Sequence, residues 1–229
     1  MSNFPIAKRI EKKLSLQHSG NSRNAGAGPE NGTWIVTDGS VGMEAQGIAV
    51  AEAVGFPYSL KRVRLTGAMR LVPARLQIYV PPRRLLDFVS SNEPLAPPWP
   101  RLIISIGRRS VPIALALRSV AKAFALHIQN PKVPKERFDL IAAPLHDGYT
   151  GKNVINTFGA VHSVTPKRLA EAAQSFAAKI DHLPCPRIAV LLGGDSAAFS
   201  FPPDLAAAFG ASLAEAARDR GGSLLVTPS

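Results

Sequence analysis

Short apolar runs that end at a glycine recur along this chain and alternate with amphipathic segments. In residues 33–55, an apolar, β-branched run meets Asp38 and Gly39 and then passes into helical spacing. The same order of apolar run, glycine turn and helical spacing returns at 102–110 and begins again at 188–196. In α/β proteins this order directs the first N–H groups of a helix toward the end of a strand, where ligands bind. The pattern therefore predicts an α/β protein with several candidate ligand-binding turns.

The apolar runs between 33 and 182 predict a single Rossmann-like domain. We expect strands at 34–37, 62–65, 102–106, 125–128, 140–143 and 154–157, and helices at 43–54, 83–89, 111–120 and 166–180. The strand segments are continuous apolar runs rather than alternating ones, which is typical of strands covered by helices on both faces. The fold class that follows is α/β, with a doubly wound parallel sheet.

The two ends of the chain differ from this central part. Residues 1–32 are polar and basic, with acids only at Glu11 and Glu30, so we expect a disordered tail. A targeting presequence is the alternative, because such segments are also poor in acids. At the other end we expect a linker at 183–187 and then strand, helix and strand at 188–192, 205–220 and 224–227. We interpret 188–229 as the first β-α-β unit of an incomplete second Rossmann-like domain.

Charge narrows the possible partners. Among 229 residues there are 27 Lys and Arg against 16 Asp and Glu, a net charge of +11. This excess favours an anionic small molecule or an anionic membrane surface. The basic residues are scattered, aromatic residues make up only 7%, and no base-stacking motif occurs, so a nucleic-acid partner is disfavoured.

Composition also bears on location. Cys185 is the single cysteine, so it has no partner for an internal disulfide, and a reducing compartment is indicated. No apolar run approaches the roughly 18 residues that a membrane-spanning helix needs. We therefore expect a cytoplasmic protein that can attach to the periphery of a membrane.

The first glycine turn offers a carboxylate beside an open backbone. Asp38 could accept a proton or a hydrogen bond from an acceptor hydroxyl, while Gly39 and Gly42 would let a substrate approach the main chain. Gln46, one turn into the predicted helix, could face the same ligand. The alternative is purely structural, with Asp38 capping the helix and the glycines supplying positive φ angles.

The second glycine turn is the best phosphate candidate of the first domain. Gly107 is followed by Arg108, Arg109 and Ser110, at the point where a predicted strand gives way to a helix. Backbone N–H groups, the helix dipole and two guanidinium groups together suit a phosphate or carboxylate. The alternative is that the arginines are solvated and Ser110 is only an N-cap.

A third group of candidates follows the later strands. His146 and Asp147 come after the strand at 140–143, so the histidine could serve as a general base oriented by Asp147 or by Asp38. A simple turn is the alternative. Gln129 ends another strand and could line the same cleft, whereas His127 has no catalytic pattern around it.

The glycine turn of the second domain would face that cleft from the other side. It comprises Gly193, Gly194, Asp195 and Ser196. Metal-ligand spacings, the P-loop lysine motif and the nucleophile elbow are missing from the sequence, so we predict neither a metal nor a cofactor.

Six segments in order carry a resemblance to a known family. They are WIVTDGSVGMEAQGIAVAEAVG (34–55), LIISIGRRSVPIALALR (102–118), HIQNPKV (127–133), FDLIAAPLHDG (138–148), TFGAVHSVTPKRL (157–169) and IAVLLGGDS (188–196). This order resembles the elongated-mitochondria family, the plant mitochondrial fission factors and their bacterial relatives, which are similar to GT-B glycosyltransferases. One departure is Met43, which stands where the family usually has histidine. The other is length, because the family usually continues through most of a second Rossmann-like domain.

The resemblance implies two alternative functions. The first is that of a GT-B hexosyltransferase, which moves a sugar from a nucleotide-sugar donor to a lipid-linked or saccharide acceptor. The second is that of a non-catalytic, membrane-associated adaptor that recruits a protein partner, such as a dynamin-related fission protein. Met43 and the short second domain favour the adaptor, whereas the glycine turns favour the enzyme.

Overall fold

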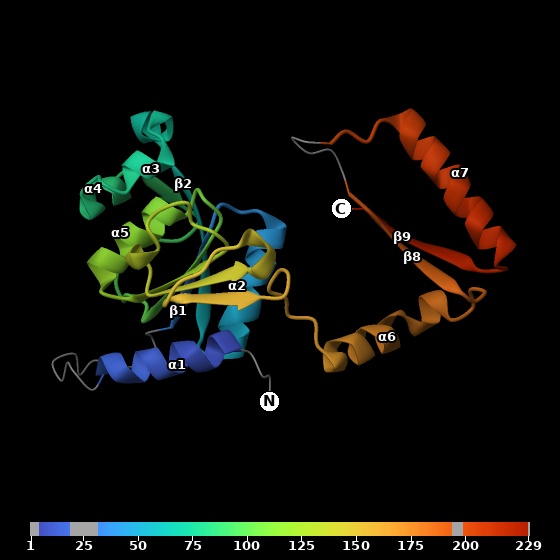
Figure 1. The fold of residues 1–229 in the computed structure, drawn as a ribbon, viewed down its shortest axis with the longest axis horizontal. Helices are drawn as coiled ribbons and strands as arrows, with labels where there is room; N and C mark the ends of the chain where they lie inside the picture. Colours follow the sequence, from blue (N-terminus) through green and yellow to red (C-terminus); the bar gives the residue numbers. More distant parts are fainter. Residues whose placement is uncertain (1–4, 19–31, 194–198, 229) are drawn as a thin grey trace. The chain divides into compact units, whose positions relative to one another are not determined.

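The structure, a computed structural model, describes residues 5–18, 32–193 and 199–228 (Figure 1). The chain divides into two compact units, Met1–Ser163 and Val164–Ser229. Each unit has its own sheet, and each is described separately below.

A seven-stranded sheet forms the centre of the first unit. Its strands lie in the order β3-β2-β1-β4-β5-β6-β7. Their bounds are β1 Thr33–Thr37, β2 Tyr58–Leu65, β3 Val89–Ser91, β4 Leu102–Ile106, β5 Phe124–Ile128, β6 Leu140–Pro144 and β7 Val154–Thr157. All neighbours are parallel except β2 and β3. The predicted α/β fold with a mostly parallel, Rossmann-like sheet is confirmed.

Helices cover both faces of this sheet. On one face, α1 (Pro5–His18) and α2 (Val41–Val54) share a buried apolar cluster with alternate residues of the central strands. On the other face, α5 (Val111–Ala121) packs in a second cluster, with α3 (Ala74–Gln77) and α4 (Pro82–Leu86) beside it (Figure 1). Because both faces are buried, β1, β4 and β5 are buried along their whole length, as their continuous apolar sequences predicted.

Two expectations near the sheet edge need correction. The helix expected at 83–89 is shorter, because α4 ends at Leu86 and the chain then forms β3. β3 runs antiparallel to β2, so the sheet is not purely parallel. The 3₁₀ helix η1 (Gly67–Leu71) and α3, absent from the expected elements, connect β2 to α4.

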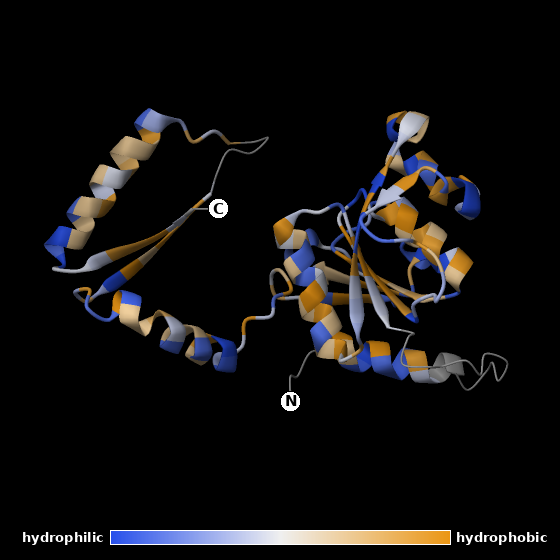
Figure 2. Ribbon diagram, turned by 180° about the vertical axis from the view of Figure 1, so that it is seen from behind, coloured by the Kyte–Doolittle hydropathy of each residue, from blue (hydrophilic) through white to orange (hydrophobic). Residues whose placement is uncertain are grey.

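The expectation of a disordered tail at 1–32 is wrong for residues 5–18. These form α1, which displays alternating hydrophobic and hydrophilic residues (Figure 2). Ile6, Ile10 and Leu14 recur at helical spacing and are buried in the core of the first unit. Lys13 Nζ also donates to the Asp139 carbonyl at 2.8 Å, which ties the helix to the sheet.

The second unit contains α6 (Pro166–Ile180), β8 (Arg187–Leu192), α7 (Pro203–Asp219) and β9 (Ser223–Pro228). β8 and β9 are parallel neighbours, so the expected β-α-β unit is present. The boundary between the units lies at Ser163, before α6, and the expected linker at 183–187 belongs inside the second unit. Arg187 explains this placement, since its guanidinium donates to the Asp181 carboxylate and to the carbonyls of Asp181 and Leu183, which joins α6 to β8.

Candidate functional site

The strand order of the first unit reverses between β1 and β4. From β1 the chain moves outward to β2 and β3, then returns to place β4 on the other side of β1. Ligands of open α/β sheets bind outside the carboxyl ends of the strands at such a reversal. The turns in this position are Asp38-Gly39 after β1 and Gly107-Arg108-Arg109 after β4. Two of the glycine turns selected from the sequence therefore lie next to each other, at what we call the switch edge.

The first turn is shaped by the Asp38 carboxylate. Its Oδ1 accepts from the backbone N–H of Ser40 at 3.3 Å, two residues on, in the manner of an Asx turn. Gly39 has φ +94°, a left-handed conformation that favours glycine. Asp38 is exposed, so the same carboxylate also faces solvent at this edge.

Three elements meet beneath the second turn. Gln129, which follows β5, places Nε2 3.4 Å from the Met43 sulfur in α2. Gly107 has φ +82°, and a Cβ added there would lie 3.9 Å from the same sulfur. Gln129, which was predicted to line the same cleft as the two turns, contacts α2 at this point. Met43 supplies a packing surface here and no titratable group.

Arg108 and Arg109 are both exposed beside this contact, at the start of α5. The role predicted for Ser110 needs correction, because its side chain is buried. Its hydroxyl oxygen lies 2.8 Å from the carbonyl oxygens of both Ile106 and Gly107, so its one hydrogen can be donated to either, and it makes no cap bond to the helix. Ser110 therefore stabilises the turn, which leaves the two arginines and the backbone to meet an anion.

His146 and Asp147 lie farther along the same edge, in the 3₁₀ helix η3 (Leu145–Asp147) after β6. His146 Nε2 is 3.6 Å from Asp147 Oδ1, and 74% of the histidine side chain is exposed. β6 lies three places from β1 in the sheet, and neighbouring strands are about 4.8 Å apart, so the strand ends that carry Asp38 and His146 are about 14 Å apart. The alternative in which Asp38 orients His146 is therefore wrong, and Asp147 is the nearby carboxylate.

Gly42 and Gln46 have modest roles in the observed geometry. No atom lies within 4 Å of a Cβ added at Gly42, so the local packing does not require glycine. Gln46 Nε2 lies 3.4 Å from the Gly42 carbonyl, one turn back in α2. Both residues remain on the first turns of α2, close to the Asp38 turn.

Sequence reasoning missed an ion pair beside the Asp38 turn. Arg62 of β2 donates from Nε and Nη2 to the two carboxylate oxygens of Glu44 in α2, at 2.7 and 2.9 Å. These hydrogen bonds from Arg62 lower the pKa of the Glu44 carboxyl. Arg62 is the partner of Thr37 in the β1–β2 register, so its side chain lies at the same end of the sheet. The two residues are 18 positions apart, and only the pairing of β2 with β1 brings them together.

A buried polar pair was also missed, inside the sheet. Ser105 of β4 and His127 of β5 are register partners, with Oγ and Nδ1 2.7 Å apart. Both side chains are fully buried, and His127 Nε2 has no hydrogen-bond partner among the described residues. Burial lowers the pKa of His127 to about 3, so the imidazole is neutral in the folded protein.

The predicted glycine turn of the second unit is described only at its first residue. Gly193 follows β8, whereas Gly194, Asp195 and Ser196 lie outside the described residues. Across the described ranges, no group of three or more His, Cys, Asp and Glu residues is placed to hold a metal ion. In the same ranges, no helix is both long and apolar enough to cross a membrane.

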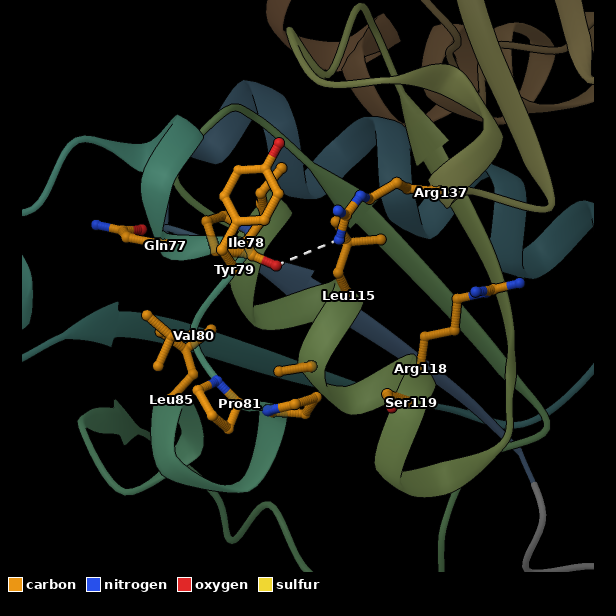
Figure 3. Close-up of a pocket in the computed structure, with 13 residues that line it drawn as sticks. Gln77, Ile78, Tyr79, Val80, Pro81, Leu85, Leu115, Arg118, Ser119 and Arg137 are labelled. Atoms are coloured by element: carbon orange, nitrogen blue, oxygen red, sulfur yellow. Dashed lines mark hydrogen bonds between the residues drawn. The ribbon is translucent and has the colours of Figure 1, made fainter.

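A pocket of about 530 Å³ lies in the first unit, between α5 and the segment that contains α3 and α4 (Figure 3). Most of its lining residues are apolar, and the guanidinium groups of Arg118 and Arg137 lie at one side. Arg137 lies over the Tyr79 ring at 5.2 Å and donates to the Ile78 carbonyl at 3.2 Å. Arg118 makes two hydrogen bonds with Asp139, at 2.7 and 2.9 Å. Both cations are thus already paired, and none of the predicted site residues lines this pocket.

Residues 41–229 match the family described as mitochondrial fission ELM1. The chain belongs to this family. A curated member, the Mitochondrial fission protein ELM1 of Arabidopsis thaliana, is 27% identical over 132 residues. The match covers 47% of the present chain and 31% of that relative, so this chain spans less than a third of it in alignment. No solved structure matches the chain significantly. The family predicted from the six ordered segments is confirmed.

Proposed function

We propose that the switch edge binds the diphosphate of a nucleotide-sugar and that the protein is a GT-B-type hexosyltransferase. The acceptor in this proposal is a lipid-linked or saccharide hydroxyl. The observation that carries it is the adjacency of two glycine turns, one after β1 and one after β4, at the reversal of strand order. Family membership supports the proposal only through the likeness of this family to glycosyltransferases.

The turn after β4 is suited to the anionic part of the ligand. Gly107 has no side chain, so a ligand can approach the backbone of the turn. Arg108 and Arg109 are exposed at the N-terminus of α5. Two guanidinium groups near the positive end of an 11-residue helix attract the two negative charges of a nucleotide-sugar diphosphate. Gln129 can donate an amide hydrogen to a ligand oxygen in exchange for its weak contact with the Met43 sulfur.

The candidate acid–base groups, Asp38 and His146, lie at different positions along the same sheet edge. Asp38 is exposed beside Gly39 and can accept a proton from an acceptor hydroxyl. His146, with Asp147 3.6 Å away, is a second candidate base about 14 Å along the edge. Because the two cannot touch, each would act on a different part of a bound molecule. The anion-binding role predicted for Gly193 to Ser196 in the second unit stays a prediction.

Binding is tested by titrating the protein with uridine and guanosine diphosphate sugars in a calorimeter. We expect the double variant Arg108→Glu with Arg109→Glu to raise the dissociation constant at least tenfold. Each lost charge-assisted hydrogen bond removes about 1.5–3 kcal/mol of binding free energy. The matched control is Arg75→Glu with Arg84→Glu, which changes the net charge equally on exposed residues that belong to neither glycine turn. Absence of binding to every nucleotide-sugar, or equal loss in both double variants, would contradict the proposal.

A second candidate function is that of a membrane-associated adaptor for a fission partner, such as a dynamin-related protein. Met43 favours it, because a thioether replaces the usual histidine at the centre of the switch edge and offers no acid, base or charge. The name of the Arabidopsis relative also points to fission rather than to sugar transfer. Release of nucleoside diphosphate from a bound nucleotide-sugar separates the two functions, since the adaptor would show none.

A further inference from the structure

The segment 67–86, which we call the basic excursion, leaves the sheet after β2 and carries η1, α3 and α4. It contains four arginines and no acidic residue, and the wider stretch 53–86 has seven Lys and Arg without one acid. Asp87 is the next acid in the chain. All four arginines of the excursion are exposed, and none forms an ion pair among the described residues. They are Arg70, Arg75, Arg83 and Arg84.

Large apolar side chains are exposed among these arginines. Leu71 is 87% exposed, Tyr79 69% and Leu76 51%. Each follows an exposed arginine by one to four positions, so cations and apolar groups alternate along a short stretch. Figure 2 shows this mixture of hydrophobic and hydrophilic residues around α3 and α4. Such exposure costs the isolated protein free energy unless another surface covers the side chains.

Buried side chains and hydrogen bonds hold the basic excursion against the rest of the first unit. The Gln77 side chain is buried, and its Nε2 donates to the Val72 carbonyl at 2.7 Å and to the Met69 carbonyl at 3.1 Å. Leu85 is buried beside α5, and Arg137 donates to the Ile78 carbonyl (Figure 3). The exposed arginines and apolar side chains therefore project from a supported backbone, not from a loose loop.

We infer that the basic excursion docks on a bilayer surface that contains acidic phospholipids. Charge complementarity identifies the occupant, because four exposed guanidinium groups without an ion pair among the described residues are attracted to an anionic surface. Leucine and tyrosine beside arginine suit the boundary between headgroups and acyl chains. A nucleic acid would engage the arginines but leave Leu71 and Leu76 uncovered. The residues of this docking surface differ from those proposed to bind the nucleotide-sugar.

Co-sedimentation of the full chain with vesicles tests this inference. We expect binding to phosphatidylcholine vesicles that contain phosphatidylserine, and little binding to phosphatidylcholine alone. Arg75→Glu with Arg84→Glu should lower the partition coefficient at least tenfold, whereas Arg108→Glu with Arg109→Glu should retain it. Absence of binding to the acidic vesicles, or equal loss in the two double variants, overturns the inference.

The apolar contribution needs its own measurement. Leu71→Ser leaves every charge unchanged and should still weaken vesicle binding severalfold. Phe158→Ser, at a residue that is 96% exposed outside the excursion, should not. Leu71→Trp should shift its fluorescence to shorter wavelength when acidic vesicles are added. An unshifted Leu71→Trp spectrum on bound vesicles would overturn the docking geometry, and circular dichroism confirms that each variant is folded.

Discussion

Replacing Gly47 by alanine is expected to lower the free energy of unfolding by about 1–3 kcal/mol. Gly47 lies in the middle of α2, where the helix crosses the sheet. A Cβ added there would lie 2.5 Å from Cδ1 of Ile106 and 2.6 Å from Cγ2 of Ile35. Both neighbours are fully buried, so relief of the overlap requires the helix to move away from β1 and β4.

Gly42 provides the matched control in the same helix. No atom lies within 4 Å of its added Cβ, and alanine is the better helix former by up to about 1 kcal/mol. Gly42→Ala should therefore stabilise the protein slightly, while Gly47→Ala destabilises it. Urea unfolding followed by circular dichroism measures both. Equal effects of the two substitutions would show that α2 does not approach the sheet as closely as the structure has it.

Acidification from pH 6.5 to 4.5 should remove roughly 2–3 kcal/mol of stability through His127 alone. Burial holds its pKa at about 3 in the folded protein, whereas the unfolded chain binds a proton near the ordinary value of 6.5. Between these values the unfolded state holds one more proton than the folded state. Stability therefore rises with pH across this window and falls as the pH drops through it, by about 1.4 kcal/mol per unit.

Substitution by asparagine isolates this effect. His127→Asn keeps a polar group beside Ser105 but cannot titrate, so its unfolding free energy should change much less between pH 6.5 and 4.5. His146→Asn, at an exposed histidine, should keep the slope of the unmodified protein. The lowered pKa of Glu44 adds its own loss of stability only below about pH 4.5, under this window. An unchanged slope in His127→Asn would rule out the buried neutral imidazole.

The central sheet could be predicted from sequence because its strands are continuous apolar runs bounded by glycine turns. The helix α1 could not, since its stability rests on remote partners. Lys13 reaches the Asp139 carbonyl, and Arg9 reaches the Lys152 carbonyl, across more than 120 residues of chain. A short polar helix without such contacts is only marginally stable in water, and for this reason the sequence of this segment alone predicted a disordered tail. β3 was missed because three half-buried residues carry no periodic signal.

The sequence indicated which residues follow the strands of the sheet, but not how far apart these residues lie. Turns that end parallel strands share one edge, and Asp38, Gly107 and Gln129 follow β1, β4 and β5 of the same sheet. Whether two turns are neighbours depends on strand order, and chain order does not reveal that β6 lies three places from β1. The partnership of Asp38 with His146 failed for this reason. The Ser105–His127 pair was missed likewise, since only the β4–β5 register brings it together.

Asp139 has a consequence for anyone who shortens or tags this chain. Its carbonyl receives Lys13 from α1, while its carboxylate receives Arg118 from α5 and the N–H of Ala125. Asp139 thus connects α1 on one face of the sheet and α5 on the other face to the start of β6. Removal of α1 would expose the apolar residues of α2 and the central strands that it covers, and would also remove the Lys13 hydrogen bond to Asp139. Expression boundaries are therefore best drawn ahead of Pro5.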